Sequence, residues 1–287
     1  MKRIIRAVVQ VISVSCLGLS GPGWAETVVS LGPPGNWTNQ ACVDLYGESQ
    51  AVVAMDDEAA YRAYEDGKID ALCVAVTTAL VGTTPYMDRV LALKNLMIIA
   101  EYPKMLGYSL IGRSGATLGS IKRVVGHPVA LEEVKPWLDE HLPNVARQPM
   151  EGGAQYVARS TQSDVAALGP EIGARIYGLE VLANHIEEGP FDVTRWWVLG
   201  KKLPPPTGHD KTTLLAATAD RDFGVIVKSL VENGVAVIDM YDRPAKAELD
   251  RHLYVIEIEG YFQDRNIQKF MQQNPQLRLL GSYPRKY

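Results

Sequence analysis

The sequence predicts an α/β domain followed by a smaller α+β domain, on the basis of three features. Strands and helices alternate over the first two thirds of the chain, as in sheets that are mostly parallel. Residues 71–76 are continuously apolar, which is typical of a strand buried on both faces. Three consecutive prolines then interrupt the chain, and the order of strands and helices changes beyond them.

The first part opens with a β-branched strand at 27–31 that ends in Gly32-Pro33-Pro34-Gly35, a strand-to-helix turn. A helix over 38–46 and an alanine- and charge-rich helix over 58–66 precede the buried strand. In the helix that ends at Leu142, Pro136 is tolerated only near the first turn. The other elements expected here are strands at 91–100 and 109–111, a strand ending at Gly169, a helix ending at Tyr177, and two further apolar strands, the second beginning near Thr194.

The last part follows a stiff linker at 204–208 and has a different pattern. We expect its elements in the order β-α-β-β-α-β, which is ferredoxin-like. They are a strand at 211–218, a helix at 223–233, strands at 235–241 and 253–259, a helix at 263–273 and a strand at 277–280.

Length and composition exclude several classes of function. The 287 residues can bury two cores, and the net charge of −4 with no long basic run argues against nucleic-acid binding. Neither a CxxC nor an HExxH motif occurs, and the five histidines are scattered, so no metal site is predicted.

The first 25 residues have the features of a secretory signal peptide. Lys2, Arg3 and Arg6 precede an apolar stretch at 7–21, and Gly23-Trp24-Ala25 offers a cleavage site before Glu26. The apolar stretch is too short and too interrupted for a retained membrane anchor. We therefore expect a periplasmic protein that is free of the membrane once the signal is removed.

Removal of the signal leaves two cysteines, Cys42 and Cys73. They could pair in an oxidising compartment, but the sequence does not give the distance between them. Both lie in apolar surroundings, so packing in the core without a bond is the favoured interpretation.

Several motifs resemble prephenate dehydratase. Residues 177–179 and 194–196 read YGL and TRW, close to the YGL and TRF of that family. Gly32-Pro33-Pro34-Gly35-Asn36-Trp37-Thr38 resembles its GPxGTFS loop, and Gly126-His127-Pro128 resembles its SHPQAL turn. The segments after the prolines that resemble the ACT domain that follows in this family are DKT at 210–212, GVIV at 224–227, DRP at 242–244 and LGSYP at 280–284.

The resemblance implies a fold, a reaction and a set of site residues. It implies a two-lobed, periplasmic-binding-protein-like domain at 26–203 and an ACT regulatory domain at 209–287. The implied reaction converts prephenate to phenylpyruvate, carbon dioxide and water without a metal or organic cofactor. Thr194 would assist departure of the ring hydroxyl, and Arg195 would bind a substrate carboxylate. The remaining substrate contacts would come from Asn36, Thr38, Thr77, Thr78 and His127.

The chain departs from the family pattern at other motifs. A family segment that reads PIENS is replaced by Thr77-Thr78-Ala79, and no STA-like stretch is recognisable near Met150-Glu151-Gly152-Gly153. These departures favour a repurposed relative that acts on another cyclic dienyl or aromatic-derived acid, as in antibiotic or tropone-type secondary metabolism. A third hypothesis is a non-catalytic periplasmic protein that binds aromatic acids or amino acids.

In the ACT-like part, two motifs, the first preserved in kind and the second altered, correspond to the family's phenylalanine site between paired domains. Gly224 and Val225 fall in the first motif, and Asp242 and Arg243 fall in the second, which has lost its glutamate and serine. The resemblance implies a homodimer that binds phenylalanine there. The alternative is that both segments serve only as a helix start and a turn.

Overall fold

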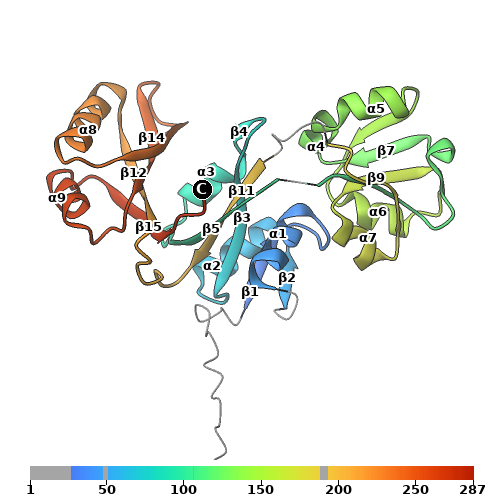
Figure 1. The fold of residues 1–287 in the computed structure, drawn as a ribbon, viewed down its shortest axis with the longest axis horizontal. Helices are drawn as coiled ribbons and strands as arrows, with labels where there is room; N and C mark the ends of the chain where they lie inside the picture. Colours follow the sequence, from blue (N-terminus) through green and yellow to red (C-terminus); the bar gives the residue numbers. More distant parts are fainter. Residues whose placement is uncertain (1–26, 48–50, 106, 188–192) are drawn as a thin grey trace, which may run out of the picture.

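The computed structural model describes residues 27–47, 51–105, 107–187 and 193–287, which form three parts in a row (Figure 1). We call them the first lobe, the second lobe and the C-terminal unit. The predicted signal peptide, residues 1–25, lies outside the described residues. Within the described ranges, none of the helices is long and apolar enough to span a membrane.

The first lobe carries parallel strands in the order β2-β1-β3, which β11 and β5 extend on one side. Strand β11 lies antiparallel between β3 and β5. The buried strand expected at 71–76 is confirmed as β3. The elements of the first lobe are β1 (Val28–Leu31), α1 (Trp37–Tyr46), β2 (Val52–Met55), α2 (Asp57–Glu65), β3 (Ala71–Thr78), β4 (Gly82–Thr83), α3 (Tyr86–Leu91), β5 (Ile98–Met105) and β11 (Val193–Gly200).

The second lobe is built on a five-stranded sheet in the order β10-β6-β9-β7-β8. The chain enters the second lobe after β5 and leaves it before β11, so it crosses between the lobes twice (Figure 1). Its elements are β6 (Ser109–Gly112), the short 3-10 helix η1 (Leu118–Ser120), β7 (Arg123–Gly126), α4 (Pro128–Glu133), α5 (Lys135–His141), β8 (Ala146–Pro149), α6 (Gly153–Arg159), β9 (Val165–Gly169), α7 (Glu171–Tyr177) and β10 (Glu180–Ala183).

The C-terminal unit has the predicted β-α-β-β-α-β order, with both helices on one face of its sheet (Figure 1). Its core contains Ile226 and Leu230 of α8 and Ile267 and Phe270 of α9, which pack on the strands. The elements are β12 (Asp210–Ala219), α8 (Asp220–Glu232), β13 (Val237–Pro244), β14 (Arg251–Glu259), α9 (Arg265–Gln273) and β15 (Arg278–Pro284).

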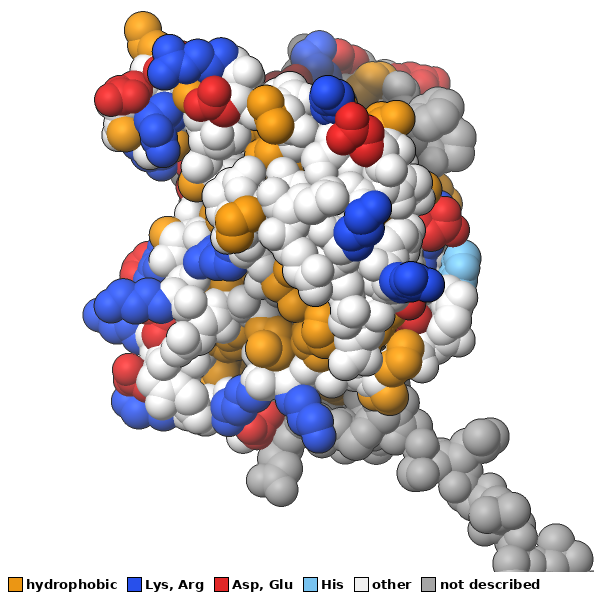
Figure 2. All heavy atoms as spheres, turned by 90° about the vertical axis from the view of Figure 1, so that its left-hand side faces the viewer, with side chains coloured by type: hydrophobic (Ala, Val, Ile, Leu, Met, Phe, Trp, Pro, Cys, Tyr) orange, Lys and Arg blue, Asp and Glu red, His pale blue; other side chains and the backbone are white. Residues whose placement is uncertain are grey.

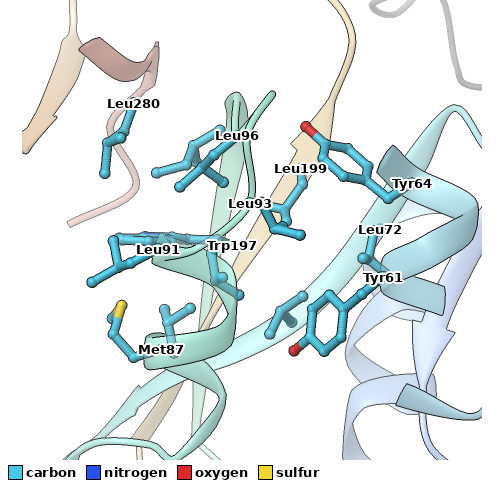
Figure 3. Close-up of a cluster of buried hydrophobic side chains, with 14 of the residues drawn as sticks. Tyr61, Tyr64, Leu72, Met87, Leu91, Leu93, Leu96, Trp197, Leu199 and Leu280 are labelled. Carbon is cyan, nitrogen blue, oxygen red and sulfur yellow. The ribbon is translucent and has the colours of Figure 1, made fainter. Parts of the chain in front are cut away.

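The C-terminal unit and the first lobe share one ten-stranded sheet. Strand β15 pairs with β5 at Gly281 and Ile98. A Cβ at Gly281 would lie 2.2 Å from the Ile98 carbonyl oxygen, so only glycine allows this approach. Leu280 of β15 also joins the apolar core that Trp197 and the first-lobe leucines form (Figure 3). The two parts are therefore continuous in both sheet and core.

One predicted element was wrong. The apolar run at 91–100 was expected to form a single strand, but helix α3 ends at Leu91 and strand β5 begins only at Ile98. Leu91, Leu93 and Leu96 lie in the core around α3 (Figure 3). A short apolar run gives no period that separates a strand from a buried helix end and turn.

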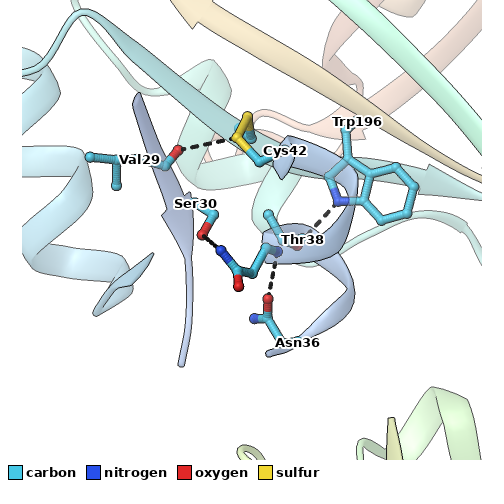
Figure 4. Close-up of a disulfide and its surroundings, with 8 residues drawn as sticks. Val29, Ser30, Asn36, Thr38, Cys42 and Trp196 are labelled. Carbon is cyan, nitrogen blue, oxygen red and sulfur yellow. Dashed lines mark hydrogen bonds between the residues drawn. A yellow bond between two sulfur atoms is a disulfide. The ribbon is translucent and has the colours of Figure 1, made fainter. Parts of the chain in front are cut away.

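The favoured interpretation of the two cysteines was also wrong. Cys42 on α1 and Cys73 on β3 are both buried, as expected, but they form a disulfide (Figure 4). Their Cα atoms lie 6.2 Å apart because α1 packs directly on β3. The bond ties the helix that begins at the first glycine-rich loop to the central strand of the first lobe.

Replacement of both cysteines by alanine is expected to lower the free energy of unfolding by about 3–4 kcal/mol. The disulfide closes a loop with a sequence separation of 31 residues, and a loop of that size gives this figure in the chain-entropy model. Urea unfolding followed by circular dichroism, with and without reductant, measures the loss. Equal stability of the parent protein in both conditions would contradict it.

Candidate functional site

A cavity of about 370 Å³ lies between the two lobes. Its lining comes from loops that follow β1, β3, β7, β8 and β9, together with the start of β11. Open α/β sheets commonly bind small molecules at the carboxyl ends of their strands, and the volume suits a small organic ligand. Of the predicted site residues, those that line the cavity are Asn36, Thr38, Thr78, His127 and Thr194.

Thr194 and Thr78 lie directly opposite each other. They are cross-strand partners in the antiparallel pair β11–β3, and both line the cavity. Side chains that face each other in this way have Cβ atoms about 4.5–5.5 Å apart. One small ligand can therefore contact both hydroxyls, as a shared cleft requires.

Arg195 faces away from the cavity, which contradicts its predicted role in binding a substrate carboxylate. Neighbouring residues of a strand point to opposite faces, so Thr194 and Arg195 cannot both reach one site. Trp196 returns to the cavity side and Trp197 to the core of the first lobe. The Arg195 guanidinium is buried against Glu257 of the C-terminal unit.

Thr77 is likewise outside the cavity, contrary to prediction. The register between β3 and β11 shifts by one residue there, because Arg195 pairs with Thr77 but Trp196 pairs with Ala75. After this bulge, Thr78 faces the cavity and Thr77 faces the other side, where its hydroxyl accepts a hydrogen bond from Arg195 Nε at 3.2 Å. Only the second of the paired threonines is available to a ligand.

Two of the cavity threonines use their hydroxyl oxygen as a hydrogen-bond acceptor. Thr38 Oγ1 accepts a hydrogen bond from Trp196 Nε1 at 3.1 Å (Figure 4), and Thr78 Oγ1 accepts one from the Val81 N–H at 3.1 Å. Each hydroxyl is thus used as an acceptor, and its hydrogen can be donated to a ligand. The cavity therefore offers oriented donors from Thr38 and Thr78 beside the Thr194 hydroxyl.

Asn36 lines the cavity but is engaged in local structure. Its Oδ1 accepts a hydrogen bond from the Asn39 N–H at 2.8 Å, which caps α1, and its Nδ2 donates to the Leu31 carbonyl at 2.8 Å. The residue shapes the glycine-rich loop and starts a ten-residue helix whose first residues, Trp37 and Thr38, line the cavity. Such a helix end favours anions through its backbone donors.

His127 caps α4 and pairs with Glu151 at the cavity. Its Nδ1 accepts a hydrogen bond from the Val129 N–H at 3.2 Å, so the proton of the neutral ring is on Nε2, which lies 3.2 Å from Glu151 Oε1. The hydrogen bond from His127 lowers the pKa of Glu151. His127 therefore orients an ionised carboxylate and has no free lone pair with which to act as a base.

His127→Ala is expected to return the pKa of Glu151 towards its ordinary value of 4.5. A carboxyl whose pKa is lowered by folding adds stability above its ordinary pKa, and this stability is lost as the pH falls through the lowered pKa. The variant should therefore lose less stability on acidification than the parent. Carbon-13 NMR titration of the Glu151 carboxyl measures the shift. His141→Ala, at the end of α5, is the control and should leave this titration unchanged. An unchanged Glu151 titration in His127→Ala would contradict the assignment of the His127–Glu151 hydrogen bond.

The ionisable side chains of the lining are few and mostly acidic. They are His127, Glu133 and Glu151, and no lysine or arginine is among the described residues that line the cavity. An anionic substrate would therefore be met by hydroxyls and backbone N–H groups rather than by a guanidinium. This environment favours a substrate that carries little net negative charge at the second-lobe side.

Several lining residues were not predicted from the sequence. They include Trp37, Tyr86, Tyr108 and Glu133, and the segment around Glu151 and Gly152. Met150–Gly153 was noted as the place where a family motif is absent, with glycines that either present backbone N–H groups to an anion or mark a flexible loop. The position of this segment could have indicated a binding role. It directly follows β8, where the carboxyl ends of parallel strands meet.

The residues expected to bind an effector in the C-terminal unit have separate surroundings. Val225 on α8 is exposed, and Gly224 has open space around it. Arg243 donates to Asp88 of α3 at 2.6 Å and to Thr83 of β4 at 3.0 Å, and its predicted contact with an effector stays a prediction. The hydrogen bond from Arg243, aided by Lys246, holds the pKa of Asp88 below its ordinary value. Arg243 is thus a contact between the C-terminal unit and the first lobe.

Comparison with known proteins gives consistent results. The family model of prephenate dehydratase matches residues 28–204. The bifunctional chorismate mutase/prephenate dehydratase of Neisseria gonorrhoeae is 29% identical over 281 residues, which cover 94% of this chain and 76% of the relative. The solved prephenate dehydratase of Arthrobacter aurescens, in complex with L-Phe, is 27% identical with a TM-score of 0.80 over 90% of each chain. GqqA, a quorum quenching acylase, has a TM-score of 0.80 at 21% identity over 91% of this chain and 98% of its own, which is a likeness of fold alone.

Proposed function

The chain belongs to the prephenate dehydratase family, and from this premise we propose that it removes carbon dioxide and water from prephenate, giving phenylpyruvate. The observation that carries the proposal is the opposed pair Thr194 and Thr78, whose side chains line one cavity between the lobes. Thr194 corresponds to the threonine of the family's TRF motif. The cavity thus keeps the hydroxyl to which that motif assigns the chemistry.

The proposed reaction breaks two bonds of the substrate. The bond from the ring to its carboxylate breaks, its electron pair enters the ring, and carbon dioxide leaves. The opposite C–O bond breaks, and the hydroxyl leaves as water with one proton from solvent. Thr194 donates a hydrogen bond to the departing oxygen as negative charge develops on it. Because a threonine is a weak acid, the main driving force is aromatisation of the ring.

Incubation of the purified protein with prephenate, followed by phenylpyruvate absorbance, tests the proposal. We expect turnover that needs no added metal or organic cofactor. A protein that binds prephenate without forming phenylpyruvate would contradict the proposal.

A second candidate is the same chemistry on a different cyclic dienyl or aromatic-derived acid. The specific observation that favours it is the acidic lining, with Glu133 and Glu151 but no lysine or arginine among the described lining residues. Prephenate carries two carboxylates, which such a cavity accommodates poorly. If prephenate is not turned over, a thermal-shift screen of aromatic acids and amino acids identifies ligands, and assay of each separates this candidate from a non-catalytic binding protein.

We further propose that the protein works in the periplasm. The signal-like features of residues 1–25 motivate this, and the Cys42–Cys73 disulfide supports it because such bonds persist in oxidising compartments. Fractionation of cells that express the full chain, with mass spectrometry of the mature N-terminus, tests both export and cleavage before Glu26.

The C-terminal unit is proposed to act as an ACT domain that pairs two copies of the chain and binds phenylalanine. Seen from its side, apolar side chains show between charged ones on its surface (Figure 2). Exposed Val225 and Val231 on α8 and Val237 and Met240 on β13 could be covered by a second copy. Light scattering with and without phenylalanine tests the pairing and its dependence on the ligand.

A further inference from the structure

A buried group of four charged side chains lies on the face of β11 opposite the cavity. Arg195 of β11 and Glu101 of β5 meet Lys211 of β12 and Glu257 of β14, and none is more than 4% exposed. Arg195 Nη1 donates to both Glu257 oxygens, at 2.7 and 2.6 Å. Lys211 Nζ lies 2.9 Å from Glu101 Oε2 and 3.0 Å from Glu257 Oε2. Two cations and two anions balance, and we call this group the charge cluster.

Tyrosine hydroxyls complete the hydrogen bonding of the charge cluster. Tyr287 Oη accepts from Arg195 Nη1 at 2.6 Å, and its ring lies 3.9 Å from Lys211 Nζ. Tyr241 Oη donates to Glu257 Oε1 at 3.2 Å. Burial lowers the pKa of Arg195, but Glu257 and the neighbouring tyrosines together raise it by more, so the guanidinium stays charged. Its charge and geometry are both determined by these partners.

The charge cluster connects the C-terminal unit to two threonines of the cavity. Arg195 is the residue after Thr194 on β11, and its Nε donates to Thr77, the residue before Thr78 on β3. Glu257 therefore binds a guanidinium that is joined to both strand ends. Because side chains alternate along a strand, the position of Arg195 on one face determines where Thr194 lies on the other.

We propose that Glu257 is a positioning residue for the cavity. Through Arg195 it holds the ends of β11 and β3 so that Thr194 and Thr78 present their hydroxyls to the same ligand. The catalytic readout of this proposal rests on the proposed function, but the structural readout does not. The C-terminal unit then supports the site directly, although it contributes no residue to the described cavity lining.

The structural test compares Glu257→Gln with Glu259→Gln. Glu259 is on the same strand, and its pair with Arg285, at 3.4 Å, is partly exposed. The probe is the indole N–H of Trp196, which donates to Thr38 on the cavity side, observed by nitrogen-15 NMR and assigned with Trp196→Phe. We expect a shifted or broadened signal for Glu257→Gln and an unchanged one for Glu259→Gln. An unchanged signal in both would overturn the proposal, whatever the substrate is.

The catalytic test uses a double-mutant cycle. Glu257→Gln and Arg195→Gln are each expected to lower kcat about 10-fold with KM within about 2-fold, and the double variant should be no worse than the poorer single one. Glu257→Asp should recover part of the loss. Additive losses, or an equal loss in Glu259→Gln, would overturn the proposal.

Tyr287→Phe provides a test that does not depend on the stability of Glu257→Gln. It removes one acceptor from Arg195 and keeps the ring over Lys211. We expect a smaller change of the Trp196 signal in the same direction, and no change would count against positioning through Arg195. If the parent protein does not turn over prephenate, the proposed function fails, while the NMR comparison still decides the role of Glu257.

Discussion

Thr194→Ala is expected to lower kcat for prephenate dehydration about 100-fold or more, with a small change in KM. In the proposed reaction the Thr194 hydroxyl would contact the leaving oxygen mainly as charge develops on it, so its loss should affect the transition state more than the bound substrate. Removal of one such positioned donor typically costs about 10²–10³ in turnover. Steady-state kinetics by phenylpyruvate absorbance measures the effect.

Two further substitutions separate the hydroxyl from the shape of Thr194. Thr194→Val keeps the branched side chain without the hydroxyl and should behave like Thr194→Ala. Thr194→Ser keeps the hydroxyl and should retain most of the activity. Activity of Thr194→Val close to that of the parent would remove Thr194 from the mechanism and leave the family likeness as one of fold and binding.

Lys211→Met is expected to lower the free energy of unfolding by about 3–5 kcal/mol. Lys211 is fully buried and contacts both Glu101 and Glu257, so its removal leaves an uncompensated negative charge in the interior. The effect is therefore much larger than the loss of a surface ion pair. Urea unfolding followed by circular dichroism measures it.

Two controls identify the cause of this loss. Lys228→Met removes an exposed partner of Glu232 on α8 and should change stability by less than about 1 kcal/mol. Lys211→Met combined with Glu101→Gln restores the charge balance and should recover part of the stability. A loss for Lys211→Met no larger than that of Lys228→Met would mean that the charge cluster contributes little to the fold.

Most of the element order could be predicted because it depends on local patterns, although α3, β8 and α6 were not expected. The apolar run of β3, the turn at Gly169-Pro170 and the helix end at Gly178 all mark their own boundaries, and the structure has them where expected. Strand β2 was missed because its four residues, VVAM, form an edge with little burial contrast. The disulfide was missed because the packing of α1 on β3 brings Cys42 and Cys73 together, and no local pattern reports that packing.

The site could be predicted only in part, for a similar reason. Thr194 lies at the start of β11 and Thr78 at the end of β3, in the same sheet, so the motifs that contain them indicated one cleft. The alternation of side chains along a strand could also have separated Thr194 from Arg195, since adjacent residues face opposite ways. The partner of Arg195 could not be foreseen, because Glu257 comes from the C-terminal unit, 62 positions later in the chain.

The shared sheet limits how the C-terminal unit can be exchanged during evolution or by engineering. A module on a flexible tether can be swapped between relatives as a cassette. Here a graft would need a glycine at 281, because any Cβ would collide with the backbone at Ile98. It would also need an acid at 257 and a base at 211 to match Arg195 and Glu101 in the host. Successful chimaeras should therefore have their crossover points outside this joint and inherit both of its sides from one parent.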